Sequence, residues 1–213
     1  MLLKKERKLI TEYGLKLIDK DLTRGTGGNL SIYNREEDLI AISPSGISYE
    51  EINLEDIVII NPEGKVVKGD HKPSSELDLH LLLFQKRNDI NAIIHTHPTY
   101  ATTIACLNQE IPPVHYLVAY AGDKVPCAKY AAFGSKKLAK NVYKTMGQNY
   151  NASLMANHGL ITVGYNIEEA LATTEMVEYT AEIYYHTKAI GEPKILNKKQ
   201  MNEVMNKFDD YRN

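Results

Sequence analysis

The stretch NLSIYNREEDLIAISPSG, residues 29–46, decides the expected fold. Two short apolar runs, 30–33 and 39–42, are separated by a polar turn and followed by a PSG loop, a pattern typical of sequential strands. Further runs of this kind occupy residues 57–60 and 65–68, again with a turn between them. Short strands that follow one another through tight turns predict antiparallel pairing.

Helical patterns and more strands follow outside this region. Apolar spacing and capping residues predict helices over residues 2–20, over 76–87 after two serines, in a short segment after Pro98, from Ser135 to about 148, and from Asn166 to about 190. Strands are expected at 91–95, 125–128, 153–156 and 161–163. Hairpin strands mixed with long helices indicate an α/β sandwich with a largely antiparallel sheet and not a regular βαβ series.

Composition excludes several classes of protein. The 213 residues suit one domain, expected over 1–213, and 43% hydrophobic with 24% charged residues is ordinary for a globular chain. A net charge of −2 gives no positive field for nucleic acid or an anionic membrane. No apolar run could span a bilayer. Without a signal-peptide pattern or a cysteine framework, we expect a cytoplasmic protein with Cys106 and Cys127 buried in its core.

The pattern IIHTHP, residues 93–98, is the sharpest indication of chemistry. His95 and His97 are two residues apart at the end of an apolar strand, so both imidazoles should face one side, about 6–7 Å apart at the backbone. Two such nitrogens can converge on one cation, since histidine is the commonest metal ligand. Alternatively, they are polar residues at a strand end that hydrogen-bond to their neighbours.

Two further segments carry residues that can join this pair. In MANHGLITVG, residues 155–164, His158 stands beside a glycine after an apolar run, which marks a crowded turn. In HKPSSELDLH, residues 71–80, Glu76 follows two serines at a helix start, where hydroxyls and free N–H groups can cradle a phosphate. His80 comes one turn later among leucines, and we expect it to be a hydrogen-bonded core histidine.

Two glycine loops, GTGGN at 25–29 and PSG at 44–46, can bind an anion through backbone N–H groups. The first lacks both the spacing of a dinucleotide fingerprint and the lysine of a P-loop. Together with the serine pair, these loops indicate a phosphorylated small molecule as ligand. Three imidazoles with one carboxylate form a divalent-metal site for which zinc is the default, with Glu76 either as fourth ligand or as a base beside the metal.

Taken in order, the segments GTGGNLS, SPSG, KPSSE, HTHP, HYLVAYAGDKVPCAKYAAFGS and ANHG resemble the class II aldolase family, of the aldolase/adducin type, which includes L-fuculose-1-phosphate aldolase. The resemblance runs from about residue 7 to about residue 190. It implies a three-layer α/β/α sandwich and a four-fold homotetramer whose active sites lie between subunits. It also implies reversible, zinc-dependent cleavage of L-fuculose 1-phosphate, or a similar ketose 1-phosphate, to dihydroxyacetone phosphate and L-lactaldehyde.

Carried over by motif, the resemblance implies a role for each candidate residue. One Zn²⁺ per subunit, or another divalent metal such as cobalt, manganese or iron, is expected on Glu76, His95, His97 and His158. Glu76 would also serve as general base, and Tyr116 from a neighbouring subunit would handle the proton on the aldehyde oxygen. The substrate and its phosphate would be held by Thr26, Gly28, Asn29, Ser45, Gly46, Ser74, Ser75 and Phe133. Tyr211 is the candidate for a C-terminal tyrosine that closes the site in some members.

Three other functions are compatible with the resemblance. A sugar-phosphate epimerase of the L-ribulose-5-phosphate 4-epimerase type uses the same ligands, although the chain length and the segment AGDKVPCAKYAAFG favour the aldolase. A dehydratase of methylthioribulose phosphate is a second enzyme of this kind. A non-enzymatic, adducin-like interaction domain is the third, and it is disfavoured because such domains do not keep the metal ligands, whereas all four are kept here.

Overall fold

A central sheet of eight strands organises the protein. The computed structural model describes the backbone of residues 1–212 and the side chains of residues 1–208. The strand order is β4-β3-β2-β1-β5-β8-β7-β6, and neighbours are antiparallel except β6 and β7, which are parallel. The strands are β1 Asn29–Asn34, β2 Leu39–Ile42, β3 Val58–Ile60, β4 Val66–Lys68, β5 Ala92–Thr96, β6 Cys127–Ala128, β7 Ala152–Met155 and β8 Gly159–Gly164. The prediction of a largely antiparallel sheet is confirmed.

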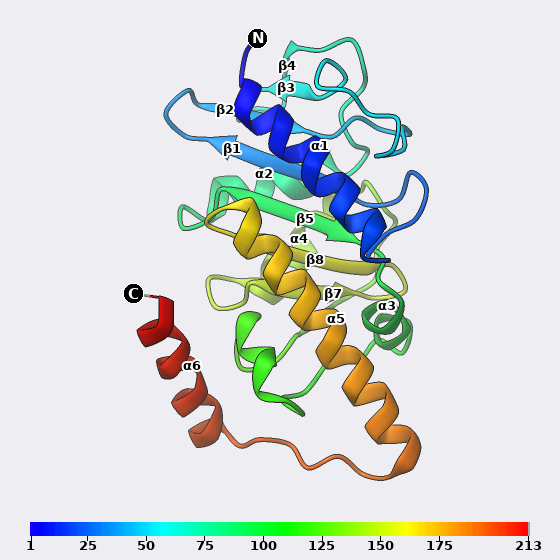
Figure 1. Ribbon diagram of the computed structural model, residues 1–213, viewed down its shortest axis with the longest axis vertical. Helices are drawn as coiled ribbons and strands as arrows, with labels where there is room; N and C mark the ends of the chain where they lie inside the picture. The colour runs from blue at the N-terminus through cyan, green and yellow to red at the C-terminus, as the bar shows by residue number, and fades with distance from the viewer. Residues whose placement is uncertain (213) are drawn as a thin grey trace.

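Helices cover both faces of this sheet. Figure 1 shows α1 and α5 across one face, with α2 and α4 on the other, so the predicted α/β/α layering is also confirmed. The helices are α1 Lys4–Asp19, α2 Leu77–Lys86, α3 Thr99–Cys106, the 3-10 helix η1 Tyr116–Tyr120, α4 Lys136–Met146, α5 Ile167–Ile190 and α6 Lys198–Arg212.

The alternation of side chains along each strand explains why both faces are covered. In β3, Val58 and Ile60 pack in the core beneath α2 and α4, whereas Ile59 between them and Ile57 before the strand pack in the core beneath α1. Because successive strand residues point to opposite faces, a continuous apolar run supplies both cores at once. Burying each such side chain contributes about 1.5–3 kcal/mol.

Helix starts follow the capping residues. The hydroxyl of Ser135 accepts a hydrogen bond from the N–H of Leu138 at 3.1 Å, and Oδ1 of Asn166 accepts one from the N–H of Glu169 at 2.8 Å. Helix α2 begins one residue later than predicted, so Glu76 precedes the helix, and its N–H is bound instead by the Ser74 hydroxyl at 3.2 Å.

The register of the sheet brings several loops to one end. Asn29, the first residue of β1, pairs with His95 near the end of β5, and Thr96 pairs with Leu160 near the start of β8. The GTGGN loop before β1, the HTHP segment after β5 and the β7–β8 turn therefore meet at the same edge. Loops that meet on a rigid sheet in this way are suited to forming a functional site.

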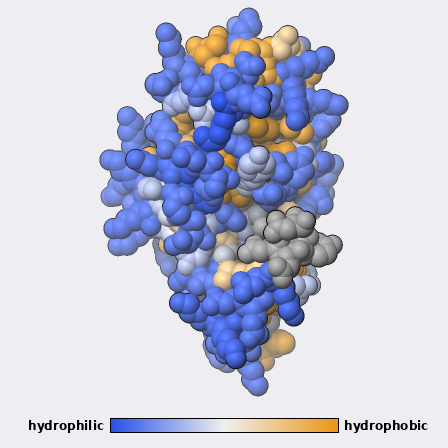
Figure 2. Space-filling model, turned by 90° about the vertical axis from the view of Figure 1, so that its left-hand side faces the viewer, coloured by the Kyte–Doolittle hydropathy of each residue, from blue (hydrophilic) through white to orange (hydrophobic). Residues whose placement is uncertain are grey.

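The surface differs from the expectations in one respect. Cys106, the last residue of α3, is exposed and Cys127 is half-buried, so the prediction of two core cysteines is wrong. Figure 2 shows a mostly hydrophilic face with hydrophobic surface at the end where β3 and β4 lie, and Val66 and Val67 of β4 are exposed. Within residues 1–212, every helix is too short or too polar to cross a membrane.

Candidate active site

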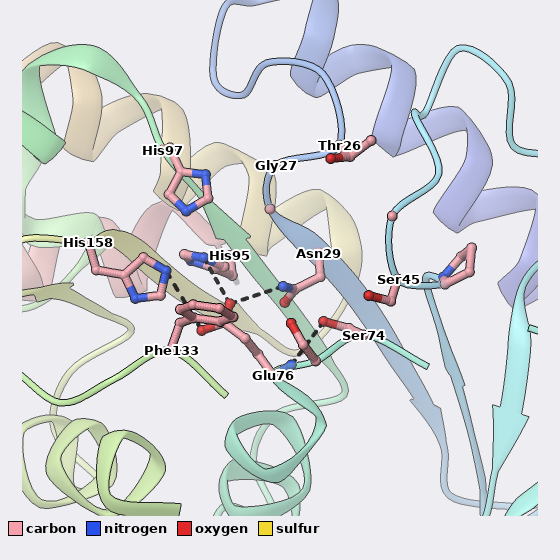
Figure 3. Close-up of a pocket in the computed structure, with 14 residues that line it drawn as sticks. Thr26, Gly27, Asn29, Ser45, Ser74, Glu76, His95, His97, Phe133 and His158 are labelled. Carbon is pink, nitrogen blue, oxygen red and sulfur yellow. Dashed lines mark hydrogen bonds and ion pairs between the residues drawn. The ribbon is translucent and has the colours of Figure 1, made fainter. Parts of the chain in front are cut away.

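The four predicted metal ligands come from separate segments that meet at one end of the sheet. His95 lies in β5 and His97 directly follows that strand, while His158 lies in the turn between β7 and β8. Glu76 immediately precedes α2, and its carboxylate points toward the three imidazoles (Figure 3). The structure therefore brings together residues that are up to 82 positions apart in the chain.

The three imidazoles form a compact cluster. The ring centroids of His95 lie 4.6 Å from His97 and 4.8 Å from His158, and those of His97 and His158 are 5.4 Å apart. One nitrogen from each ring lies within 4.8 Å of the other two. Because zinc–imidazole bonds are about 2.0–2.1 Å long, small movements of the rings allow all three nitrogens to reach one ion.

The contacts of Glu76 and His95 show whether a cation fits between their side chains. The Nδ1–H of His95 donates to the carbonyl oxygen of Leu160 at 2.8 Å, so in the neutral ring Nε2 carries the lone pair. That nitrogen lies 3.0 Å from Oε2 of Glu76, and Oε1 of Glu76 lies 3.7 Å from Nε2 of His158. His95 Nε2 and Glu76 Oε1 are buried and make no hydrogen bond within the described residues. Buried acceptors that face each other need a cation between them, and a divalent ion fits this donor set.

Burial and charge together set the protonation of the cluster. Burial raises the pKa of Glu76, but the charges of His95 and His158 and the hydrogen bond from Asn29 outweigh it and hold that pKa well below its usual range. Burial and the charge of His95 lower the pKa of His97 to about 3, and they also lower the pKa of His158. For His95, the Glu76 carboxylate outweighs burial and raises the pKa. Glu76 is therefore ionised and His97 and His158 are neutral, which are the forms that bind metals, and a cation here would take the place of the proton that Glu76 favours on His95.

The same four residues line a pocket with ten others. Those ten are small, polar or flexible in backbone, apart from one proline and one aromatic ring: Thr26, Gly27, Gly28, Asn29, Pro44, Ser45, Gly46, Ser74, Ser75 and Phe133. The pocket has a volume of about 230 Å³, a little below the range of about 300–1,000 Å³ for small-molecule sites. None of the fourteen described residues that line it is a lysine or an arginine, so an anion here would be held by neutral donors.

Donors without partners gather on the rim of this pocket. The backbone N–H groups of Gly28, Gly46 and Ser75, and the hydroxyls of Ser45 and Ser75, make no hydrogen bond within the described residues. Gly28 and Gly46 have φ of 74° and 77°, a conformation that glycine adopts without strain. Backbone N–H groups in loops of this kind can bind an anion, and the sequence pattern predicts that they do so here.

Phe133 stands at the mouth of the pocket, with 72% of its surface exposed. It lies in the loop between β6 and α4, next to Gly134, whose φ is 68°. A Cβ at Gly134 would lie 2.7 Å from the carbonyl oxygen of Ser75, so glycine permits this loop to pack directly on the serine segment. An aromatic ring is thereby held beside the polar donors (Figure 3).

Tyr116 is the one predicted site residue with a described side chain that the structure does not bring to this pocket. It is the first residue of η1, is 48% exposed, and stacks on Phe208 of α6 with ring centroids 6.3 Å apart. It lines a separate, mainly apolar surface pocket with Val204, Lys207 and Phe208. The prediction for Tyr211 falls on a side chain outside the described residues.

Two residues outside the predicted set of site residues, Gly27 and His80, also shape the site. Gly27 lines the pocket, and a Cβ there would lie 3.0 Å from Nδ1 of His97. His80 is fully buried and hydrogen-bonded, as expected, but its partners are Asn29 and Ser31 on β1. The available signal was periodicity, because residues 29 and 31 share a strand face and His80 lies one helical turn after Glu76.

Comparison with known proteins agrees with this geometry. The model of the family described as class II aldolase and adducin N-terminal domain matches residues 8–185. The 5-deoxy-D-ribulose 1-phosphate aldolase of Bacillus thuringiensis serovar kurstaki is 53% identical over 211 residues, which cover 99% of each chain. The L-fuculose phosphate aldolase of Escherichia coli (strain K12) is 38% identical over 199 residues, covering 92% of this chain and 91% of the relative.

A solved structure is similar to the whole molecule. A protein titled L-fuculose 1-phosphate aldolase superposes with a TM-score of 0.94 at 46% sequence identity, covering 96% of both chains. The likeness therefore includes the sheet, its covering helices and the loops that line the pocket.

Proposed function

We propose that this chain, which belongs to the class II aldolase and adducin family, cleaves a ketose 1-phosphate between its third and fourth carbon atoms. The chain is a class II aldolase, a carbon–carbon lyase. The observation that carries the proposal is one pocket that combines a buried carboxylate, three imidazoles and a rim of unpartnered N–H and hydroxyl donors. The family acts on phosphorylated sugars, and this rim suits the phosphate end of such a substrate.

Among possible substrates, we propose 5-deoxy-D-ribulose 1-phosphate first and L-fuculose 1-phosphate second. The relative named for the first sugar is 53% identical to this chain, and the relative named for the second is 38% identical. Cleavage of either gives dihydroxyacetone phosphate, with acetaldehyde from the first and L-lactaldehyde from the second. Both aldehydes end in a methyl group, which suits the exposed ring of Phe133 at the pocket mouth.

The residues divide between the two ends of the substrate. Class II aldolases are metal-dependent, and we propose one Zn²⁺ per subunit held by His95, His97 and His158, with Glu76 as a further ligand. When bound, this ion supplies a Lewis acid for the ketone oxygens. Glu76 acts as general base, because its Oε1 is buried, ionised and without a hydrogen-bond partner in the described residues.

The phosphate is held away from the reacting carbons. Gly28, Asn29, Ser45, Gly46, Ser74 and Ser75 supply neutral donors, with Thr26 beside them. Binding through this non-reacting end orients the bond that breaks. Because no lysine or arginine is among the described residues that line the pocket, we expect their attraction for the phosphate to come from short-range hydrogen bonds and to depend little on salt.

Tyr116 enters the proposal through assembly. Within one chain it does not line the pocket, so its action on the aldehyde oxygen requires a second copy of the chain. We propose a cytoplasmic homotetramer in which Tyr116 of one subunit reaches the pocket of its neighbour. Mixing inactive Glu76→Gln and Tyr116→Phe subunits should then restore activity at about one quarter of the sites, those that combine an intact Glu76 with an intact Tyr116 from the neighbour. Mixed tetramers with no recovery of activity would remove the shared site.

A substrate panel tests the reaction itself. The zinc-loaded protein is incubated separately with 5-deoxyribulose 1-phosphate, fuculose 1-phosphate and ribulose 5-phosphate, and dihydroxyacetone phosphate and epimerised sugar are measured in parallel. We expect dihydroxyacetone phosphate from the first two sugars, with the higher kcat/KM for the first. Epimer formation from ribulose 5-phosphate without cleavage of the others would overturn the proposal in favour of a 4-epimerase.

A further inference from the structure

One face of β1 is matched residue by residue to one face of α2. Asn29, Ser31 and Tyr33 alternate with residues that pack beneath α1, so they face α2 instead. Their partners, Glu76 just before α2 and His80 and Phe84 within it, are spaced one helical turn apart. Asn29 contacts Glu76 and His80, and Ser31 also contacts His80. Tyr33 packs edge-on against Phe84, with ring centroids 5.4 Å apart. The contacts of Asn29 and Ser31 are polar and lead into the pocket, whereas the contact of Tyr33 with Phe84 is apolar.

The polar contacts form a chain with only one consistent direction. Nδ2 of Asn29 donates to Oε2 of Glu76 at 3.1 Å, so Oδ1 of the same amide points the other way, toward Nε2 of His80 at 2.5 Å. An amide oxygen carries no hydrogen, so Nε2 of His80 must be the donor. In a neutral ring Nδ1 is then an acceptor, and it receives the hydroxyl hydrogen of Ser31 at 2.6 Å.

We propose that His80, with its tautomer fixed by Ser31, is a positioning residue that orients the Asn29 amide so that its N–H groups face Glu76 and the pocket. One N–H of the amide binds Glu76, and the second remains for an anion in the pocket. The turned amide would instead place its oxygen against the Glu76 carboxylate, where two acceptors repel each other. The inference rests on the proposed function for its catalytic consequence, but its geometry does not depend on the identity of the sugar.

Burial makes His80 suited to this role. The side chain is fully buried, and its two nitrogens are both used within the described residues. Burial disfavours a charged ring, and the contacts with Asn29 and Ser31 fit a neutral one, so the ring keeps one donor and one acceptor. Second-layer partners of this kind orient ligands and typically change metal affinity about 10–100-fold when removed.

Spectroscopy tests the tautomer directly. The ¹⁵N spectrum of histidine-labelled, zinc-loaded protein distinguishes the Nε2–H from the Nδ1–H form of a neutral ring. We expect His80, assigned by comparison with His80→Gln, to be the neutral Nε2–H tautomer at pH 7. Ser31→Ala should shift the ring toward the other tautomer, while Ser153→Ala, which removes another buried strand hydroxyl, should not. An Nδ1–H ring in the unaltered protein would overturn the proposal.

Zinc affinity tests the positioning. By competition with a chelator, His80→Leu should weaken binding about 10–100-fold, whereas His80→Gln, which keeps an N–H donor, should lose at most a few-fold. In an Asn29→Ala background, His80→Leu should add less than about 3-fold, because the amide it orients is gone. Phe84→Leu is the matched control on the same helix face: it should lower the melting temperature and leave zinc affinity unchanged.

The outcomes distinguish a positioning role of His80 from a role in packing alone. Equal losses of zinc affinity in Phe84→Leu and His80→Leu, or independent effects of the Asn29 and His80 changes, would reduce His80 to a packing residue and overturn the proposal. If His80→Leu does not fold, the ¹⁵N spectra of the unaltered protein and of Ser31→Ala still decide, because they report the tautomer of His80 directly. None of these readouts uses a sugar substrate, so an error in the proposed reaction would leave them unaffected.

Discussion

Gly159 lies directly against the ring of His97. A Cβ built on Gly159 would be 2.7 Å from Cδ2 of His97 and 2.5 Å from the carbonyl oxygen of Thr96. The second contact is with backbone, which cannot move aside as a flexible side chain can. Glycine at the start of β8 therefore lets the segment after β5 approach closely enough for the imidazoles to cluster.

Replacing this glycine tests the close approach. Gly159→Ala should lower the free energy of unfolding by about 1–3 kcal/mol through overpacking, and should weaken metal binding because His97 is displaced. Urea denaturation and metal analysis measure the two effects. Gly191→Ala is the control, since an added Cβ there has no heavy atom within 4 Å, and it should change neither quantity.

The metal assignment predicts a specific loss. His95→Ala or His97→Ala should abolish stoichiometric binding of a divalent metal, because each removes one of three clustered nitrogens. Elemental analysis after purification measures the metal. His71→Ala is the control, since His71 lies on the surface beside Asp56 and away from the cluster. Full metal occupancy in the His95 or His97 variant would show that the ligand set is wrong.

The serine segment predicts a binding effect. The hydroxyl and N–H of Ser75 are exposed in the pocket and unpartnered within the described residues. Ser75→Ala removes one hydrogen bond to the phosphate, so KM should rise about 10-fold while kcat changes little. Steady-state kinetics with the phosphorylated and the unphosphorylated ketose provide the comparison. Equal efficiency of the two ketoses with the unaltered enzyme would contradict a phosphate role for this rim.

The strands and the cluster of histidines could be predicted because their signals are local. In β1 and β2 the apolar runs and the intervening turn predicted the hairpin, and β2 has the predicted bounds. His95 and His97 follow from period-2 spacing at a strand end. The close approach at Gly159 agrees with the crowded turn expected from its position beside His158.

Other features depend on contacts between distant segments. The orientation of the Asn29 amide is set by His80, 51 positions away, and no local pattern encodes it. Tyr116 lies in an apolar 3-10 helix against α6, and the contact that we propose for it with the pocket of a neighbouring subunit cannot be read from one chain. Helix α6 was not predicted, although its start carries a local signal. Oδ1 of Asn197 accepts a hydrogen bond from the N–H of Gln200 at 3.0 Å, and Oε1 of Gln200 accepts one from the N–H of Asn197 at 2.9 Å, which is a reciprocal cap.

The buried ring of His80 predicts a pH dependence of stability. Its pKa is held at about 3 in the folded protein, chiefly by burial, against about 6.5 in the unfolded chain, with Glu76 and His95 as the charged groups that act on it. As pH falls from 7.5 to 5, the unfolded chain gains a proton that the folded protein does not bind. His80 should therefore cost about 2 kcal/mol of stability over this interval.

Comparison with His80→Gln isolates this contribution, because glutamine does not titrate. Urea unfolding of both metal-free proteins at pH 7.5 and pH 5 gives the two differences in free energy. We expect the unaltered protein to lose more stability on acidification than the variant. The same loss in both would show that His80 is protonated in the folded state, contrary to its burial.

The division of labour between Glu76 and Tyr116 predicts that two half-reactions separate. Exchange of the proton on dihydroxyacetone phosphate needs the base but no aldehyde, and Glu76 lies in the pocket with the imidazoles. The proton on the aldehyde oxygen belongs to the step that breaks the carbon–carbon bond. Glu76→Gln should therefore abolish exchange, provided that metal occupancy is confirmed, because the variant keeps the shape of the side chain and loses the base.

Tyr116→Phe keeps the ring that stacks on Phe208 and deletes only the hydroxyl, so packing should hardly change. We expect exchange to persist in this variant while cleavage falls about 10²–10⁴-fold, the usual contribution of a positioned proton donor. Loss of exchange with Tyr116→Phe and its survival in Glu76→Gln would reverse the two roles. Equal loss of both activities in both variants would contradict the division altogether, because neither residue would then act on only one end of the substrate.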